Sequence, residues 1–159
     1  MQRILLILLA SVASAQSSLE FRILKEGVLE EHLRSASPKN PERYKRLKDL
    51  FAQSGCEGDS FREQKVGGSK EPNMICGLAG SGEHPRKIIV GVHFDSVGGD
   101  GIIDNWSGAV LLPTLFEFTR DTQRRHAFEF VGFAAEEKGV LGSSRMRKNS
   151  DFGLVLQPS

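Results

Sequence analysis

The apolar residues fall into short runs separated by glycine-rich or charged segments, a pattern typical of α/β proteins. The runs at 87–92 and 126–135 are rich in β-branched and aromatic residues, which predicts two buried strands. Between them, after a glycine-rich loop, apolar residues recur at helical spacing from Trp106 to near Asp121. Because a helix joins the two strands, we expect them to be parallel neighbours that end at the same edge of a sheet.

Further elements are expected before this unit. A short helix is predicted around 28–33, and a longer one over NPERYKRLKDLFAQSG, from Asn40 to a stop at Gly55. The longer helix has its apolar residues on one face, so its basic residues are predicted to face water. Strands are expected at 61–66 and 73–78. Together these elements predict a mostly parallel mixed sheet flanked by helices.

The first 15 residues predict a secretory signal peptide. Arg3 precedes an apolar core from Ile4 to Val12, and small residues at 13–15 form a cleavage site. The core is too short to cross a bilayer as a helix, and we expect no membrane span elsewhere. Residues 16–159 are expected to form a single α/β domain in a secreted or periplasmic protein.

Charge is nearly balanced along the chain. The 159 residues include 21 Lys and Arg and 20 Asp and Glu, interspersed, for a formal net charge of +1. A basic patch of the kind that binds nucleic acid or an anionic membrane is therefore not expected. The pattern does not predict an oligomeric state.

Two cysteines, Cys56 and Cys76, lie between the longer helix and the end of the second strand. In an exported protein such a pair predicts a disulfide bond. Two buried thiols are the alternative, because sequence spacing does not determine the distance between the Cα atoms.

The candidate functional residues lie where the two central strands end. His93 and Asp95 follow the first strand, Glu136 and Glu137 follow the second, and Asp104 lies at or near the helix N-cap. Since these positions share one sheet edge, the side chains should converge, and several carboxylates repel one another unless a cation lies among them. An imidazole with carboxylates suits zinc, which activates water for hydrolysis. Asp95 would orient His93, and one of the two glutamates would bind metal while the other acts as general base.

Each of these residues also has an ordinary structural interpretation. His93 alone would be a satisfied strand-end histidine, Asp104 an N-cap and Asp95 a loop cap. The glutamate pair alone would be a solvated strand end. The metal hypothesis therefore depends on all of them occurring together and in order.

Four motifs resemble one known family. H-F-D at 93–95, D-N-W-S-G-A at 104–109, A-A-E-E-K-G at 134–139 and L-G-S at 141–143 look like those of the two-zinc exopeptidases of metallopeptidase family twenty-eight. This family includes secreted aminopeptidases and is related to glutamate carboxypeptidase and glutaminyl cyclase. The similarity spans about 73–149, and it implies that the chain holds the N-terminal part of the zinc-exopeptidase fold.

The resemblance also implies roles for individual residues. His93 would bind the first zinc, Asp104 would bridge both, Glu137 would bind the second, and Glu136 would be the general base. A cis peptide bond would follow Asp104. The family completes its sites with an Asp after the next strand and a His near its C-terminus. Here the last apolar run, 152–156, is followed by no acid before the chain stops, so both zinc sites are expected to be incomplete.

The function implied by the resemblance is a zinc-dependent aminopeptidase that hydrolyses peptides. A noncatalytic secreted remnant that binds a peptide or a metal is the first alternative. A glutaminyl-cyclase-like acyltransferase is the second.

Overall fold

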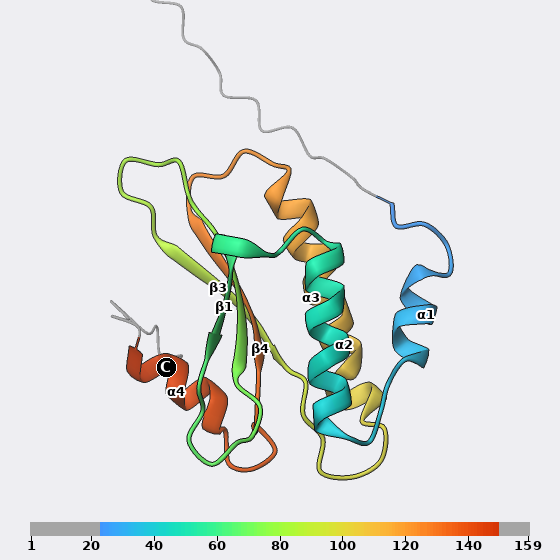
Figure 1. Ribbon diagram of the computed structural model, residues 1–159. Helices are drawn as coiled ribbons and strands as arrows, with labels where there is room; N and C mark the ends of the chain where they lie inside the picture. The colour runs from blue at the N-terminus through green and yellow to red at the C-terminus, as the bar shows by residue number, and fades with distance from the viewer. Residues whose placement is uncertain (1–22, 150–159) are drawn as a thin grey trace, which may run out of the picture.

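A four-stranded mixed sheet forms the middle layer of the structure, a computed structural model that describes residues 23–149 (Figure 1). Its strands, in spatial order, are β1 (Phe61–Gln64), β2 (Asn73–Leu78), β4 (Ala127–Phe133) and β3 (Lys87–His93). The predicted mixed sheet with flanking helices is confirmed. Parallel pairing does not predominate in this part of the chain, because β1–β2 and β2–β4 are antiparallel and β3–β4 is parallel.

Helices cover both faces of the sheet (Figure 1). The helices are α1 (Val28–Arg34), α2 (Asn40–Gln53), α3 (Ser107–Arg120) and α4 (Leu141–Asn149). On one face, Leu47 of α2 and Phe116 of α3 are fully buried in the main core, against which α1 also packs. On the opposite face, Met146 of α4 packs against Ile75 and Val131 of the sheet. The result is a three-layer arrangement in which β2 and β4 are largely buried. No residue of β3 is buried, so the prediction of a buried strand at 87–92 is wrong; within residues 23–149 this strand has a neighbour, β4, on one side alone.

The central unit has the predicted connectivity. In the parallel β3–β4 pair, Lys87 lies opposite Ala127 and His93 lies opposite Phe133. The chain leaves β3, passes through α3 over the sheet and returns to β4. Residues that follow the two strands therefore start from the same edge of the sheet, whereas His126, which precedes β4, lies at the other end.

α4 is an element that the hydrophobic pattern did not predict. Its sequence, LGSSRMRKN, contains two large apolar residues, Leu141 and Met146, which are too few to produce a helical periodicity. Met146 is buried against the sheet, and this contact gives the helix its place on the sheet. Tertiary packing therefore positions α4 where the local sequence carries little signal.

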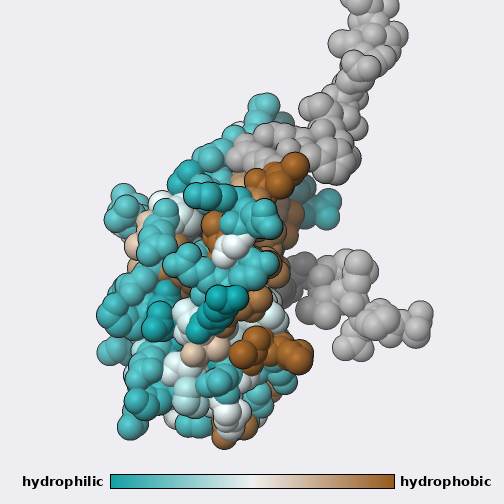
Figure 2. Space-filling model, turned by 90° about the vertical axis from the view of Figure 1, so that its right-hand side faces the viewer, coloured by the Kyte–Doolittle hydropathy of each residue, from teal (hydrophilic) through white to brown (hydrophobic). Residues whose placement is uncertain are grey.

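The outer side of the helical layer, where α1 lies, is largely hydrophilic, with hydrophobic side chains gathered along one margin (Figure 2). On α2, Lys45, Arg46 and Lys48 are exposed as predicted. Arg43 departs from that prediction, because its side chain is fully buried. Its guanidinium donates hydrogen bonds to backbone carbonyl groups inside the protein, which makes its burial tolerable.

A disulfide bond joins Cys56, just after α2, to Cys76 in β2, with the Cα atoms 6.0 Å apart. The disulfide prediction is confirmed, and the alternative of two buried thiols is excluded. Both residues belong to the main core. The bond thus ties the helical layer to the sheet.

Replacing both Cys56 and Cys76 by alanine is expected to lower the free energy of unfolding by about 3 kcal/mol, because the bond closes a loop with a sequence separation of 20 and so restricts the unfolded chain. Urea denaturation followed by circular dichroism measures the change. Reduction of the unmodified chain should give a similar loss. An unchanged urea midpoint in both experiments would contradict the prediction.

Within residues 23–149, no helix is both long enough and apolar enough to cross a bilayer. The predicted signal peptide at 1–15 and the apolar run at 152–156 lie outside the described residues.

Candidate metal centre

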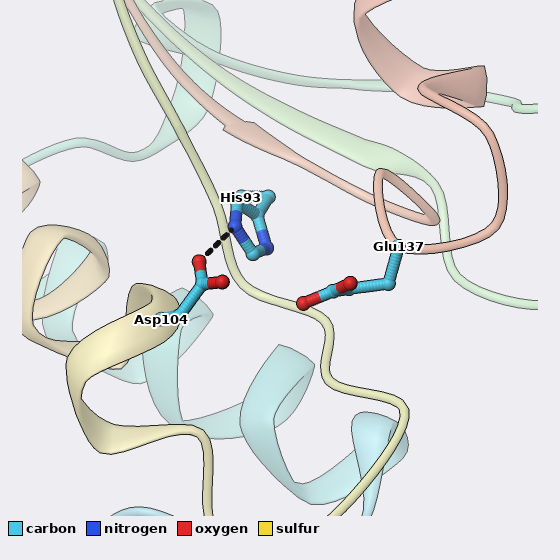
Figure 3. Close-up of side chains that lie close together, drawn as sticks. All are labelled: His93, Asp104 and Glu137. Atoms are coloured by element: carbon cyan, nitrogen blue, oxygen red, sulfur yellow. Dashed lines mark hydrogen bonds and ion pairs between the residues drawn. The ribbon is translucent and has the colours of Figure 1, made fainter.

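Three of the predicted ligand side chains meet at the edge where β3 and β4 end. They are His93 at the end of β3, Asp104 before α3 and Glu137 after β4, and they present ligand atoms within 4.8 Å of one another. The Nε2 atom of His93 lies 3.0 Å from Oδ1 of Asp104, and Glu137 points toward this pair from the opposite side (Figure 3). The structure thus brings together the residues that the strand topology predicted to converge.

The three side chains differ in exposure. The imidazole of His93 is 17% exposed and so is held by its surroundings, whereas the carboxylate of Asp104 is 78% exposed. Glu137 is exposed as well. The two acids are therefore accessible to an ion from solution and free to adjust around a more rigid histidine.

The donor set fits zinc. Imidazole nitrogen and carboxylate oxygens bind zinc at about 2.0–2.2 Å, so two ligands of one ion lie at most about 4.4 Å apart. The observed limit of 4.8 Å is close to this span, and rotation of the exposed carboxylates can close the difference. Calcium and magnesium prefer oxygen-only sites, which makes the imidazole informative. No other group of three such side chains comes together within residues 23–149.

Asp95 holds the two strand ends together. Its buried carboxylate accepts hydrogen bonds from the backbone N–H groups of Glu136, at 3.0 Å, and Glu137, at 3.1 Å. Its backbone carbonyl lies 3.2 Å from Nδ1 of His93, while its carboxylate lies farther from that atom, at 3.7 Å. We predicted that the carboxylate would orient His93, but the carbonyl is the nearer partner. The carboxylate mainly positions the backbone that carries the glutamates.

Replacing Asp95 by asparagine is expected to lower the free energy of unfolding by about 2–3 kcal/mol, because one carboxylate oxygen becomes an amide group that faces a backbone N–H. Chemical denaturation measures this loss. Asp49→Asn is a matched control, since Asp49 pairs with Lys45 on the exposed surface of α2 and its loss should cost little. Equal free energies of unfolding in the two variants would show that the Asp95 hydrogen bonds do not stabilise the fold more than a surface ion pair does.

Glu136 points away from its neighbour, Glu137. Its two carboxylate oxygens accept hydrogen bonds from the backbone N–H of Ser143, at 2.7 Å, and from the Ser143 hydroxyl, at 2.8 Å. The adjacent glutamates therefore leave the strand end in different directions, as predicted. Ser143 lies in the first turn of α4 within the L-G-S motif, and its contact with Glu136 has no signal in the local sequence.

Asn73, at the start of β2, supports the segment between β4 and α4. This fully buried side chain accepts a hydrogen bond from the N–H of Ala134 and donates to the carbonyl of Gly142, both at 2.9 Å. It therefore fixes both ends of the segment that carries the two glutamates. A lone asparagine at the start of a strand gives no sequence signal for this role.

Asp104 lies close to the start of α3. The N-cap residue of α3 is Trp106, and Asp104 lies in the preceding turn, Ile102–Trp106, with non-helical angles of φ −123° and ψ 91°. Asp104 thus lies two residues before the N-cap, near it as predicted, and its carboxylate contacts His93. The peptide bond from Asp104 to Asn105 is cis, as the family resemblance implied.

The chain belongs to peptidase family M28, whose sequence model matches residues 73–155. Leucine aminopeptidase 2 of Trichophyton rubrum is 38% identical over 73 residues, a segment that covers 45% of this chain and 14% of that protein. LapA of Legionella pneumophila aligns in structure with a TM-score of 0.61 and 23% identity, covering 76% of this chain and 37% of LapA. A glutaminyl cyclase of Porphyromonas gingivalis aligns with a TM-score of 0.51 and 18% identity, covering 78% of this chain and 51% of the cyclase. The two structural similarities show the shared fold.

Proposed function

We propose that this chain carries the metal centre of a zinc-dependent aminopeptidase, with His93, Asp104 and Glu137 as zinc ligands. The observation that carries the proposal is the convergence of their ligand atoms within 4.8 Å at one sheet edge. Membership of peptidase family M28 and the similarity to a leucine aminopeptidase support the peptidase assignment.

The surroundings of His93 support a cation at this position. Both ring nitrogens face oxygen acceptors: Nδ1 faces the carbonyl of Asp95 and Nε2 faces the carboxylate of Asp104. A neutral imidazole can donate to only one of these acceptors. If Nδ1–H donates to the carbonyl, Nε2 is free to bind a metal that the Asp104 carboxylate also binds.

Bound zinc would supply a Lewis acid that polarises a peptide carbonyl and makes water more acidic. Glu136 would act as the general base, accepting a proton from the attacking water and passing it to the leaving amine. The Ser143 contacts hold this carboxylate in one orientation, and each of its oxygens retains a second acceptor site. Glu137 would remain a zinc ligand, since the two side chains point in different directions.

A noncatalytic metal-binding domain is the second candidate. It is favoured by the engagement of both Glu136 oxygens with Ser143, which gives this carboxylate a structural role in attaching α4 to the strand end. The glutaminyl-cyclase alternative rests on similarity of fold, and that similarity identifies no residue specific to cyclisation.

Zinc titration by calorimetry, combined with hydrolysis of leucyl p-nitroanilide, tests the proposal. Zinc binding together with turnover that a chelator abolishes supports the aminopeptidase. Zinc binding without turnover supports the noncatalytic domain, and cyclisation of an N-terminal glutaminyl peptide supports the cyclase. No zinc binding would overturn the metal centre itself.

We also propose that the protein is exported. The N-terminal apolar stretch and the disulfide between Cys56 and Cys76 support this, because disulfides persist in oxidising compartments. N-terminal sequencing of the exported protein should show a chain that begins at Gln16. Retention inside the cell with an intact N-terminus would contradict the proposal.

A further inference from the structure

Arg43 is a fully buried arginine in α2, next to the segment that connects β3 to α3. We call residues 94–106 the site loop, because they join His93 to Asp104 and end at the start of α3. Arg43 precedes the region that the family model matches, 73–155, so the family similarity assigns it no role.

The guanidinium of Arg43 contacts the site loop at both ends. Its Nε donates to the carbonyl of Phe94, its Nη1 donates to the carbonyl of Asp100 at 2.5 Å, and its Nη2 donates to the carbonyl of Gly101 at 3.3 Å. The same group lies over the indole ring of Trp106, 4.9 Å from the ring centre. A further bond, at 3.1 Å, goes to the carbonyl of Ser37 before α2.

These contacts lie beside the proposed ligands in the sequence. Phe94 directly follows His93, Gly101 lies three residues before Asp104, and Trp106 lies two residues after it. A guanidinium is planar and presents its N–H groups in a fixed fork, so one side chain can set the distance between several carbonyls. Arg43 thus links the loop residue that follows His93 to the loop residues on either side of Asp104.

Asn40, one turn earlier on α2, strengthens the same connection. Its side chain pairs with the backbone of Ser96: the Ser96 N–H donates to Oδ1 at 2.9 Å, and Nδ2 donates to the Ser96 carbonyl at 3.1 Å. The first turns of α2 therefore hold the site loop at Ser96 as well as at the carbonyls that Arg43 contacts.

Because Arg43 carries a charge, its side chain does more than fill space in the core. Burial lowers the pKa of Arg43, while the negative charges of Asp95 and Asp100 raise it. A buried guanidinium is costly unless its N–H groups are satisfied, and here backbone carbonyls satisfy them. An apolar side chain would fill the same space without binding the loop.

We propose that Arg43 is a positioning residue for the metal centre, holding the site loop so that His93 and Asp104 present ligand atoms 3.0 Å apart. This inference rests on the zinc-binding function proposed above. It assigns part of the support of the site to α2, which lies outside the matched family region. It also predicts that loss of the Arg43 contacts changes metal geometry without removing any ligand.

The test compares Arg43→Lys and Asn40→Ala with the control Arg124→Lys in the full chain. Arg124 also donates to several backbone carbonyls, including those of Ala79 and Thr122, but it does so at the opposite end of α3. Zinc affinity is measured by competition with a chromophoric chelator, cobalt(II) spectra report ligand geometry, and urea denaturation reports stability. Arg43→Lys should weaken zinc binding by about tenfold or more and shift the cobalt bands. Asn40→Ala should do so to a smaller extent, and Arg124→Lys should do neither.

The outcomes separate the two proposals. Failure of the unmodified chain to bind zinc overturns the proposed function and the inference with it. Zinc binding by the unmodified chain, with equal affinity and an equal cobalt spectrum in folded Arg43→Lys, overturns the inference alone. Should Arg43→Lys not fold, Asn40→Ala decides: unchanged affinity and spectrum overturn the inference, and a loss of affinity with a shifted spectrum supports it.

Discussion

Replacing His93 by alanine is expected to lower the affinity of the chain for zinc by more than about 100-fold. Changes to residues that only orient a metal ligand cost about 10–100-fold in affinity, so loss of a ligand itself should cost more. His93 is also the one nitrogen donor in the group, and its 17% exposure shows that it is the most restrained of the three side chains. Calorimetry and the zinc content after dialysis measure the effect.

His84→Ala is the matched control for this experiment. His84 is exposed in the loop between β2 and β3, and it is not part of the metal-ligand group. Its replacement should leave zinc affinity unchanged. Circular dichroism should show that the His93 variant is folded, since it loses one hydrogen bond, worth about 1 kcal/mol. A folded His93 variant that binds zinc as tightly as the unmodified chain would contradict the assignment of His93 as a ligand.

The central strands and the helix between them were predictable from sequence because their apolar runs are long and continuous. The strand at Asn73–Leu78 has the predicted bounds, and the strand that begins at Lys87 extends one residue beyond its prediction. β2 and β4 are largely buried and apolar at most positions, and this composition gives a strong local signal. The antiparallel pairing of β2 with β4 was not predictable, since it depends on contacts between segments far apart in the chain.

The ligand positions were predictable for a related reason. His93 ends β3 and Glu137 follows its parallel neighbour β4, and the connectivity alone brings such positions to one sheet edge. Asp104 was predicted at or near the helix N-cap and lies two residues before it. The local pattern does not reveal whether such an aspartate caps the helix or contacts a histidine.

The residues that support the ligands were not predictable. Ser143, Asn73 and Arg43 act through partners that lie 7, 61 and 51 residues away in the sequence. In the local sequence pattern, Arg43 is indistinguishable from the other basic residues of an amphipathic helix. Only the folded chain shows that carbonyl groups of a distant loop accept its hydrogen bonds.

Replacing Glu136 by glutamine is expected to reduce peptidase turnover by about 10²–10⁴-fold while leaving zinc affinity nearly unchanged. Glutamine has the shape of glutamate, and its amide can still accept the bond from the Ser143 N–H and donate to the Ser143 hydroxyl. It cannot act as a base at neutral pH. Hydrolysis of leucyl p-nitroanilide at saturating zinc, with calorimetry on the same samples, measures both quantities.

Ser143→Ala separates the proposed catalytic role of Glu136 from its structural role. This variant removes the hydroxyl contact and keeps the backbone N–H contact, so Glu136 loses some restraint but remains a base. If Glu136 is the general base, Glu136→Gln should lose far more activity than Ser143→Ala. The urea midpoint of Glu136→Gln should stay close to that of the unmodified chain, because both contacts with Ser143 are kept. If Glu136 only attaches α4 to the strand end, any turnover of the unmodified chain should persist in Glu136→Gln. Persistent turnover in a folded, zinc-loaded Glu136→Gln variant would therefore refute the assignment, because no proton acceptor would remain at that position.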